Sequence, residues 1–392
     1  MMWKTALSIC LCFSEFTVIF GQEQINHFSQ KEDTLLIRTE KVKGSAPFDF
    51  IGGFIDLEDT SDLFDFPIDH PDSLTNILGS RIPVDLESKL DYVDLISGEF
   101  ANKGIVIIVD QNNNQSFRDD EIYSLLPIDW NSSKNSIPVS FSISDGRDTL
   151  QTSSWIRIGY QDRDIFYGRD EYLEAPITID NQQFKVGIID RVFSGNFTYG
   201  LEPELALLSS TNLLNEDIIE VRDLIKKEEY LKLNNAYYKF DSITNSGSYI
   251  RLIKERNFDE KVGTQVGMLA PDFIFKSAIG DTINTRFLHD KPLIIANTCG
   301  CGGDTQSPQA SYEIMESYKN EAYVFRLDSF SEPPTNEWVI NMEEEFNKDA
   351  YDKYRQAYCS RICYVIGKNR RILDKFYVTD WNTSLKAKLL FK

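Results

Sequence analysis

Short apolar runs separated by turn residues fill most of the chain from residue 22 to residue 260, and this pattern limits the fold more than any other feature. The runs are rich in Val, Ile, Tyr and Phe, residues that favour strands. Examples are Thr34–Thr39, Gly104–Asp110, Pro138–Ser144, Trp155–Tyr160 and Phe184–Asp190. The runs Tyr237–Ile243 and Ser248–Lys254 flank the turn sequence Thr244-Asn245-Ser246-Gly247, which predicts a β-hairpin. We expect a β-rich region here, sandwich-like or barrel-like, built from one or two units.

Two stretches depart from this pattern. Glu and Lys recur at helical spacing over Leu213–Leu233, which predicts a helix that links two halves of the β-rich region. After Gly267, strand and helix patterns alternate. The expected strands are Leu293–Asn297, Tyr323–Asp328, Cys363–Ile366 and Ile372–Val378, and the expected helices are Ser307–Tyr318, Asn336–Asn347 and Trp381–Leu390. Such alternation predicts a sheet with helices packed on its faces.

Length and composition support a globular protein with several parts. A chain of 392 residues suggests two or three folding units, and 42% hydrophobic residues are enough to build their cores. The sequence thus predicts an α+β multidomain protein, with a β-rich region over 22–260 and an α/β region over 263–392. The formal charge of −20 repels phosphate backbones and anionic membrane surfaces, so it disfavours a nucleic-acid partner.

The first 21 residues have the outline of a secretory signal peptide. Lys4 precedes an apolar run that ends at the small residue Gly21, although Glu15 interrupts the run. A retained membrane helix is the alternative, but it needs about 20 uninterrupted apolar residues. We expect an exported protein, periplasmic or otherwise in the cell envelope, with no stable membrane span after cleavage.

Four cysteines would remain after cleavage, and all lie in the last hundred residues. They are Cys299, Cys301, Cys359 and Cys363. In an oxidising compartment, an even and clustered set of cysteines indicates disulfides or a metal site rather than idle thiols.

The last third contains three motifs, at Gly267–Phe273, Lys291–Cys299 and Tyr364–Asn369. Together they resemble motifs of exported bacterial thioredoxin-like domains, of the kind named for cytochrome maturation and of the peroxiredoxin-like kind. Gly267-Met268-Leu269-Ala270-Pro271-Asp272-Phe273 is similar to their G-x-x-A-P-D-F opening. Lys291–Cys299 is similar to the strand that precedes their reactive cysteine, and Tyr364–Asn369 to a later Y-L-I-D-K-N strand. The resemblance covers roughly residues 263–392 and implies a thioredoxin-like fold there.

The resemblance also implies a reactive cysteine at the start of a helix, where backbone N–H groups and the helix dipole lower the pKa of a thiol. Cys299 occupies that place, and Cys301 is the expected resolving cysteine, with Cys363 as the alternative. The motif departs from the family pattern, because it is C-G-C and not C-x-x-C. The position of the family's cis-proline is taken by about Arg361, whose charge could lower the pKa of a nearby thiol.

Three arrangements of the cysteines stay open at this point. Cys299 and Cys301 could exchange disulfides while Cys359 and Cys363 form a supporting bridge. A pair such as Cys301 and Cys363 could instead link two loops. Four thiolates could also hold a metal or an iron–sulfur cluster.

A calcium-loop motif follows the expected strand that ends at Asp110. Oxygen-bearing side chains stand at Asp110, Asn112, Asn114 and Ser116, and Glu121 occupies the twelfth position, which is the spacing of an EF-hand loop. The sixth position is Gln115 and not the usual glycine. A plain polar turn is the alternative to a calcium site.

Two hypotheses on function follow from the sequence. The first is an exported thiol-disulfide oxidoreductase-like protein that acts on protein thiols or disulfides through Cys299. The second is a binding or scaffold protein of the cell envelope, in which the β-rich region binds a partner and the thioredoxin-like region keeps only its fold.

Overall fold

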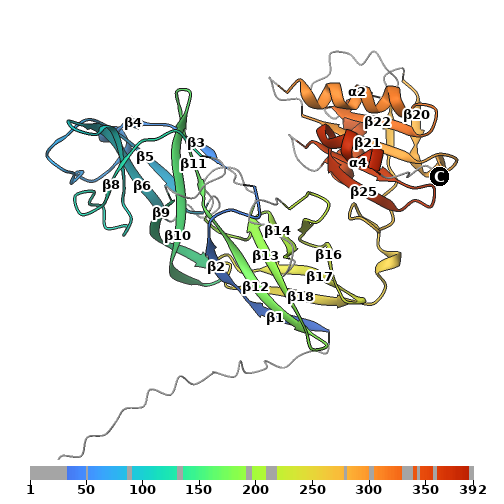
Figure 1. The fold of residues 1–392 in the computed structure, drawn as a ribbon, viewed down its shortest axis with the longest axis horizontal. Coiled ribbons are helices and arrows are strands. Elements are labelled where there is room, and N and C mark those ends of the chain that lie inside the picture. Colours follow the sequence, from blue (N-terminus) through green and yellow to red (C-terminus); the bar gives the residue numbers. More distant parts are fainter. Residues whose placement is uncertain are drawn as a thin grey trace, which may run out of the picture.

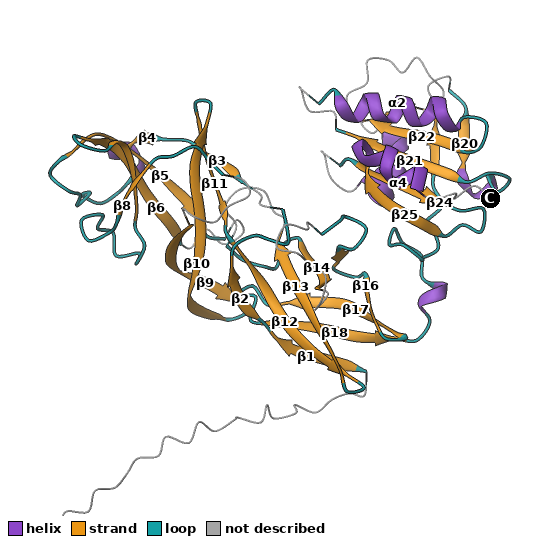
Figure 2. Ribbon diagram, in the orientation of Figure 1, coloured by secondary structure: helices purple, strands orange, loops and turns teal. Residues whose placement is uncertain are grey.

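The computed structural model describes residues 33–49, 52–85, 91–129, 136–190, 197–208, 219–277, 280–299, 304–328, 339–341, 345–355 and 360–387. Over these residues the chain is mostly β-sheet (Figures 1 and 2). Within the same residues, none of the helices has both the length and the apolar character needed to cross a bilayer.

The β-rich part contains two pairs of packed antiparallel sheets. In the first pair, one sheet has the order β3 (Gly53–Ile55), β11 (Asp164–Arg169), β10 (Asp148–Gln161), β9 (Ser136–Asp145). The other has the order β4 (Glu58–Asp59), β5 (Leu74–Pro83), β6 (Tyr92–Phe100), β7 (Gly104–Val109), β8 (Ile122–Ser124), with the short helix α1 (Thr60–Leu63) between β4 and β5. Alternate residues of β9, from Ile137 to Ile143, are buried against β6 and β7. A strand buries every second side chain on one face, which explains this period.

The second pair also consists of two packed antiparallel sheets. One sheet has the order β15 (Ile225–Lys226), β14 (Pro203–Leu208), β13 (Gln182–Asp190), β12 (Glu171–Ile179), β2 (Glu40–Lys43). The other has the order β1 (Thr34–Arg38), β18 (Tyr249–Glu255), β17 (Ala236–Ile243), β16 (Tyr230–Leu233). Residues of β12, β13, β17 and β18 share one buried cluster.

The expected hairpin of β17 and β18 is confirmed, and its turn requires a glycine. Gly247 has φ +73°, and a Cβ there would lie 2.6 Å from Leu173 Cδ1 and 2.7 Å from Tyr199 Cδ2. A side chain at this position would therefore be strained by the backbone and would also collide with the core.

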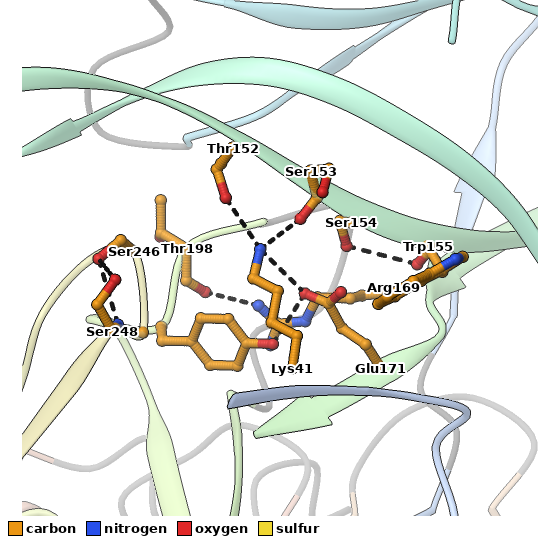
Figure 3. Close-up of polar contacts among 12 residues, drawn as sticks. Lys41, Thr152, Ser153, Ser154, Trp155, Arg169, Glu171, Thr198, Ser246 and Ser248 are labelled. Atoms are coloured by element: carbon orange, nitrogen blue, oxygen red, sulfur yellow. Dashed lines mark hydrogen bonds and ion pairs between the residues drawn. The ribbon is translucent and has the colours of Figure 1, made fainter. Parts of the chain in front are cut away.

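A polar cluster, buried at Glu171 and half-buried at Lys41, joins the two pairs of sheets (Figure 3). Lys41 on β2 reaches β10, where its ammonium donates to Thr152 Oγ1 at 3.1 Å and to the Ser153 carbonyl. Lys41 also lies 3.6 Å from Glu171 Oε1, which accepts a hydrogen bond from the Tyr199 hydroxyl at 2.9 Å. Burial lowers the pKa of Lys41, and the charge of Glu171 opposes that shift.

The C-terminal residues form a mixed sheet of different character. Its order is β23 (Val339–Asn341), β22 (Tyr323–Asp328), β21 (Leu293–Thr298), β24 (Ile362–Ile366), β25 (Ile372–Tyr377). The strands β21, β22 and β23 are parallel, while β24 and β25 are antiparallel to their neighbours. A small hairpin of β19 (Ile274–Lys276) and β20 (Thr282–Asn284) precedes this sheet.

Helices and apolar side chains cover both faces of this sheet. Ile294 and Ala296 face α2 (Gln306–Tyr318) and α4 (Trp381–Ala387), whereas Leu293 and Ile295 pack on the other side, near α3 (Lys348–Ala350) and the π-helical turn Tyr351–Arg355. The central strand β21 is therefore buried along its whole length.

Polar contacts fix this sheet against the β-rich part. Asp374 and Lys375 of β25 are both buried. Arg222 Nη1 lies 3.3 Å from Asp374, and Lys375 Nζ donates to the Leu224 carbonyl at 3.1 Å and lies 3.6 Å from Glu229.

Two expected helices are wrong. Residues 219–233 hold turns and the strands β15 and β16 in place of a helix, and residues 213–218 lie outside the described part. Ile225, Leu231 and Leu233 are buried between sheets, so tertiary packing overrides the helical spacing of the charges. In the second expected helix, Asn336–Asn347, the described residues form β23 and a 3₁₀ turn, Glu345–Asn347.

Replacing Glu171 by Ala should lower the free energy of unfolding by about 3–5 kcal/mol, because it leaves Lys41 without its counter-ion. The double variant Lys41→Met/Glu171→Leu should lose less than the single variant, since it leaves no unpaired charge. Urea denaturation measures both effects. As a control, Lys185→Ala removes the more exposed pair with Glu174 and should cost at most about 1 kcal/mol. An equal loss for Glu171→Ala and the control would contradict this role of the cluster.

Candidate functional site

The expected reactive cysteine lies where the central strand ends. Cys299 directly follows β21, and helix α2 begins seven residues later at Gln306. Thr298 and Cys299 are both buried, with 0% and 2% of their surface exposed. The backbone N–H of Cys299 donates to Ser307 Oγ at 3.1 Å, so the helix start and the cysteine are directly connected.

Asp304 organises the start of the helix. Its carboxylate accepts the backbone N–H of Ser307 at 3.1 Å and also the Ser307 hydroxyl. Arg361 Nε lies 3.1 Å from the same carboxylate. Burial opposes ionisation of Asp304, but the hydrogen bonds from Ser307 and the charge of Arg361 outweigh it and hold its pKa below the usual value. Arg361 therefore lies beside the cysteine segment, through an ion pair with an acidic residue.

Two buried residues that the motifs did not indicate complete the surroundings of Cys299. Asn297, fully buried, donates from Nδ2 to the carbonyls of Tyr354 (3.2 Å) and Ile362 (2.8 Å). Arg355, 2% exposed, donates from Nη1 to the carbonyls of Thr298 (2.9 Å) and Leu327 (3.1 Å). The sequence signal for Asn297 is weak: a polar residue at the end of an apolar strand. Arg355 has no signal, because it lies in a stretch rich in charges.

The structure excludes some of the cysteine arrangements that the sequence left open. Cys299 is disulfide-bonded, and its partner lies outside the described residues, as do Cys301 and Cys359. Cys363 on β24 is a free thiol, fully buried beneath α2 and α4. Burial, and next the charge of Asp374, raises the pKa of Cys363. The expected bridges from Cys363 to Cys359 or to Cys301 are therefore wrong.

A metal held by four thiolates, one of the three arrangements that the sequence left open, is not the arrangement in this structure, because the sulfur of Cys299 is in a disulfide. Within the described ranges, no group of three or more His, Cys, Asp or Glu side chains could hold a metal ion.

The calcium-loop motif forms a tight turn after β7. Asp110 accepts the backbone N–H groups of Asn114 (3.0 Å) and Gln115 (2.7 Å). Gln115 has φ +65°, so it adopts the left-handed conformation that glycine supplies in EF-hand loops. The loop thus turns as the motif requires, without the glycine.

The loop's oxygen groups converge only in part. Asn112 and Asn114 both donate to Asp119 Oδ2 at 3.0 Å, which brings in a carboxylate that the motif did not include. Ser116 instead donates to Asp69 Oδ2 at 3.1 Å, and Glu121 accepts from the Tyr123 hydroxyl at 3.0 Å.

Burial opposes the ionisation of Asp110 and Asp120 in this loop, whereas hydrogen bonds from Asn112 and Asn114 hold the pKa of Asp119 below its usual value. Burial raises the pKa of Asp110, and the charge of Asp119 adds to the shift. Burial and the charges of Asp110 and Asp119 raise the pKa of Asp120 to about 6. Its Oδ2 atom is buried and has no hydrogen-bond partner among the described residues.

Solved structures that match this chain include thioredoxin-like proteins, and each of these matches covers about a third of the chain. The thioredoxin domain of a thiol-disulfide oxidoreductase of Bacteroides vulgatus is 11% identical, with a TM-score of 0.25, and the match covers 31% of this chain and 96% of that chain. An exposed lipoprotein thioredoxin of Streptococcus pneumoniae is 14% identical, with a TM-score of 0.24, 30% of this chain covered and 100% of that one. Copper-bound yeast Sco1 is 13% identical, with a TM-score of 0.24 and coverage of 31% and 94%.

No protein-family model matches the chain, and no curated protein matches it. The partial resemblance to thioredoxin-like thiol-disulfide oxidoreductases, expected from the motifs, is confirmed.

Replacing Asp304 by Ala should lower the free energy of unfolding by about 1–2 kcal/mol, because the start of α2 loses its side-chain acceptor. The pKa of Asp304 is lowered in the folded protein, so its contribution is present above the unfolded pKa of about 4 and is lost as pH falls below it. The difference between wild type and variant, measured by urea denaturation from pH 7 to pH 2.5, should therefore shrink in acid. A difference that stays constant over this range would contradict the ionised role of Asp304.

Proposed function

We propose that this chain is an exported thiol-disulfide oxidoreductase-like protein in which Cys299 is the attacking cysteine. One observation carries the proposal: Cys299 is a disulfide-bonded residue between the central strand β21 and the start of helix α2. Backbone N–H groups at a helix start favour a thiolate over a thiol. The same place in the fold thus supplies both an oxidised sulfur and a setting that stabilises its reduced, reactive form.

The proposed reaction is a disulfide exchange in two steps. In the reduced protein, the Cys299 thiolate attacks one sulfur of a substrate disulfide, and the other substrate sulfur leaves as a thiolate and takes a proton. The thiolate of Cys301 then attacks the Cys299 sulfur, which releases the second substrate thiol and leaves an internal disulfide. The protein is oxidised by two electrons and the substrate is reduced by two.

The surroundings favour Cys301 over Cys363 as the resolving cysteine. Cys363 is fully buried and its pKa is raised, so it is a poor source of thiolate. Arg361 supports the centre by its ion pair with Asp304, which holds positive charge near the helix start. Cys359 is the remaining cysteine of this region, and its flanking residues Arg355 and Arg361 both contact the segment around Cys299. Cys359 is therefore the alternative disulfide partner of Cys299.

We further propose two folding units after an N-terminal signal peptide, residues 22–260 and residues 263–392. The pairs of packed sheets in the first unit have their own buried clusters, and the mixed sheet of the second has its own as well. In this layout the β-rich unit recognises a protein thiol or disulfide, or an envelope protein. The rival function is a scaffold in which both units only bind.

Replacing Cys299 by Ser should abolish the reduction of insulin by dithiothreitol-primed protein, because the attacking sulfur is lost. Turbidity of the insulin B chain measures the activity. The matched control is Cys363→Ser, which removes a buried thiol outside any disulfide and should keep most of the activity.

Peptide mapping of the oxidised protein identifies the partner of Cys299, and we expect Cys301. Wild-type protein that stays inactive and keeps its Cys299 disulfide in excess dithiothreitol would contradict the oxidoreductase proposal and favour the scaffold.

A second candidate function is calcium binding by the loop that follows β7. The observation that favours it is the geometry of the turn, in which Asp110 accepts the N–H groups of Asn114 and Gln115 while Asn112 and Asn114 lie on the Asp119 carboxylate. A divalent cation here would need the amide oxygens as ligands beside Asp110, because no three acidic side chains of the described residues are grouped to hold it. Asp110, Asn112 and Asn114 are the ligands that we propose, with Asp119 near them, whereas Ser116 and Glu121 would have to turn from their present partners.

Calcium should raise the melting temperature of the wild-type protein by several degrees, and Asp110→Asn should remove most of this shift. The matched control Asp164→Asn, at the exposed first residue of β11, should keep it. Asp120 has a raised pKa of about 6, so without calcium its contribution to stability is lost as pH rises from about 4 through about 6, and the stabilisation by calcium should grow over that range. Differential scanning fluorimetry with calcium or magnesium at pH 5 and pH 7.5 tests this. An unchanged melting temperature in millimolar calcium would contradict the site.

A further inference from the structure

Hydrogen bonds run in both directions between the end of β21, before Cys299, and the π-helical turn that ends at Arg355. Asn297 donates to the Tyr354 and Ile362 carbonyls, while Arg355 donates to the Thr298 and Leu327 carbonyls. Thr298 and Leu327 stand near the carboxyl ends of the parallel strands β21 and β22. The guanidinium of Arg355 therefore bridges two strand ends, and one of them leads directly into Cys299.

A buried arginine that bridges two strand ends is unusual, because removing a guanidinium from water is unfavourable unless hydrogen bonds compensate. Arg355 is 2% exposed and closes a π-helical turn, a feature that often occurs at functional sites. A neutral donor could bond one carbonyl without the desolvation cost of a charge. Hydrogen bonding alone therefore does not explain why this residue carries a positive charge.

Charged groups surround Cys299 from several elements. On the helix side, Asp304 pairs with Arg361. On the β22 side, Arg326 donates to Thr298 Oγ1 at 3.3 Å and pairs with Asp328. Arg355 adds a cation on the side of the π-helical turn, hydrogen-bonded to the carbonyl of the peptide that joins Thr298 to Cys299.

We propose that Arg355 is a positioning residue of the Cys299 centre, which fixes the Thr298 carbonyl and favours the thiolate of Cys299 through its charge. This inference rests on the proposed function. Once the disulfide opens, a positive charge hydrogen-bonded to the carbonyl of the adjoining peptide would lower the pKa of the Cys299 thiol. Asn297 fixes the distance between the two segments.

The test is the pH profile of Cys299 alkylation in the reduced full-length protein. Iodoacetamide labelling is quantified on the Cys299 peptide by mass spectrometry from pH 5 to pH 10. Arg355→Gln, which keeps a donor but loses the charge, should raise the apparent pKa by about one unit, so that labelling below that pKa slows about tenfold. Arg355→Lys, which keeps the charge, should stay close to wild type.

A further variant separates charge from structure. Tyr354→Phe removes the hydrogen bond to the Pro271 carbonyl (2.7 Å) from the same turn without changing any charge, and it should leave the profile in place. If Arg355→Gln does not fold, Arg355→Lys alone provides the test. It keeps the charge and loses the planar set of donors, so its profile should stay close to wild type, and a raised pKa would overturn the role of the charge.

The outcomes distinguish this inference from the proposed function. If Cys299 reacts in every variant with the wild-type profile, or if Tyr354→Phe shifts the profile as much as Arg355→Gln, the role of Arg355 is overturned while the oxidoreductase remains. If reduced wild-type Cys299 does not react at any pH, both proposals fail.

Discussion

The carboxyl end of strand β21 is the constraint on which the rest of this site depends. Asn297 and Thr298 bring polar groups into a fully buried position, where an unmade hydrogen bond costs about 1–3 kcal/mol. Backbone carbonyls from the π-helical turn and from β24 accept the Asn297 amide, and Arg355 satisfies the Thr298 carbonyl. Hydrogen bonding therefore draws the segments on both sides of residues 356–359 toward the strand end that carries Cys299.

The β-rich part contacts the same sheet at its edge strand β25. Asp374 and Lys375 are buried on β25, and both find their partners in residues 222–229 of the β-rich part. Since β25 pairs with β24, and β24 pairs with β21, a chain of direct strand contacts joins this interface to the cysteine. The interface with the β-rich part and the cysteine thus belong to adjacent strands of one sheet.

Much of the fold could be predicted from local patterns, because strands use β-branched and aromatic residues between turn residues. The runs that became β1, β7, β9, β13 and the β17–β18 hairpin have this composition, and β9 also buries every second residue. The expected helix over 213–233 is wrong because its charges have helical spacing while Ile225, Leu231 and Leu233 are buried by sheets distant in sequence. Spacing along the chain does not contain that information.

The site was predictable to the extent that it resembles a known motif. Cys299 and Arg361 follow from the resemblance, and the structure places Arg361 beside the helix start through Asp304. Arg355 could not be found in this way, because the stretch Tyr351–Arg355 has the composition of an exposed helical turn. Its burial results from the carbonyls of Thr298 and Leu327, which only the assembled sheet brings together.

The central claim is that Cys299 belongs to a disulfide that exchanges with other thiols. Its reduction potential tests this claim most directly, by equilibration of the protein in a series of dithiol and glutathione buffers and by counting of alkylated Cys299 in each. The account predicts one two-electron transition at a potential above about −300 mV, the range of labile and catalytic disulfides. A Cys299 disulfide that remains intact well below that potential would be a structural bridge, and the account would be wrong.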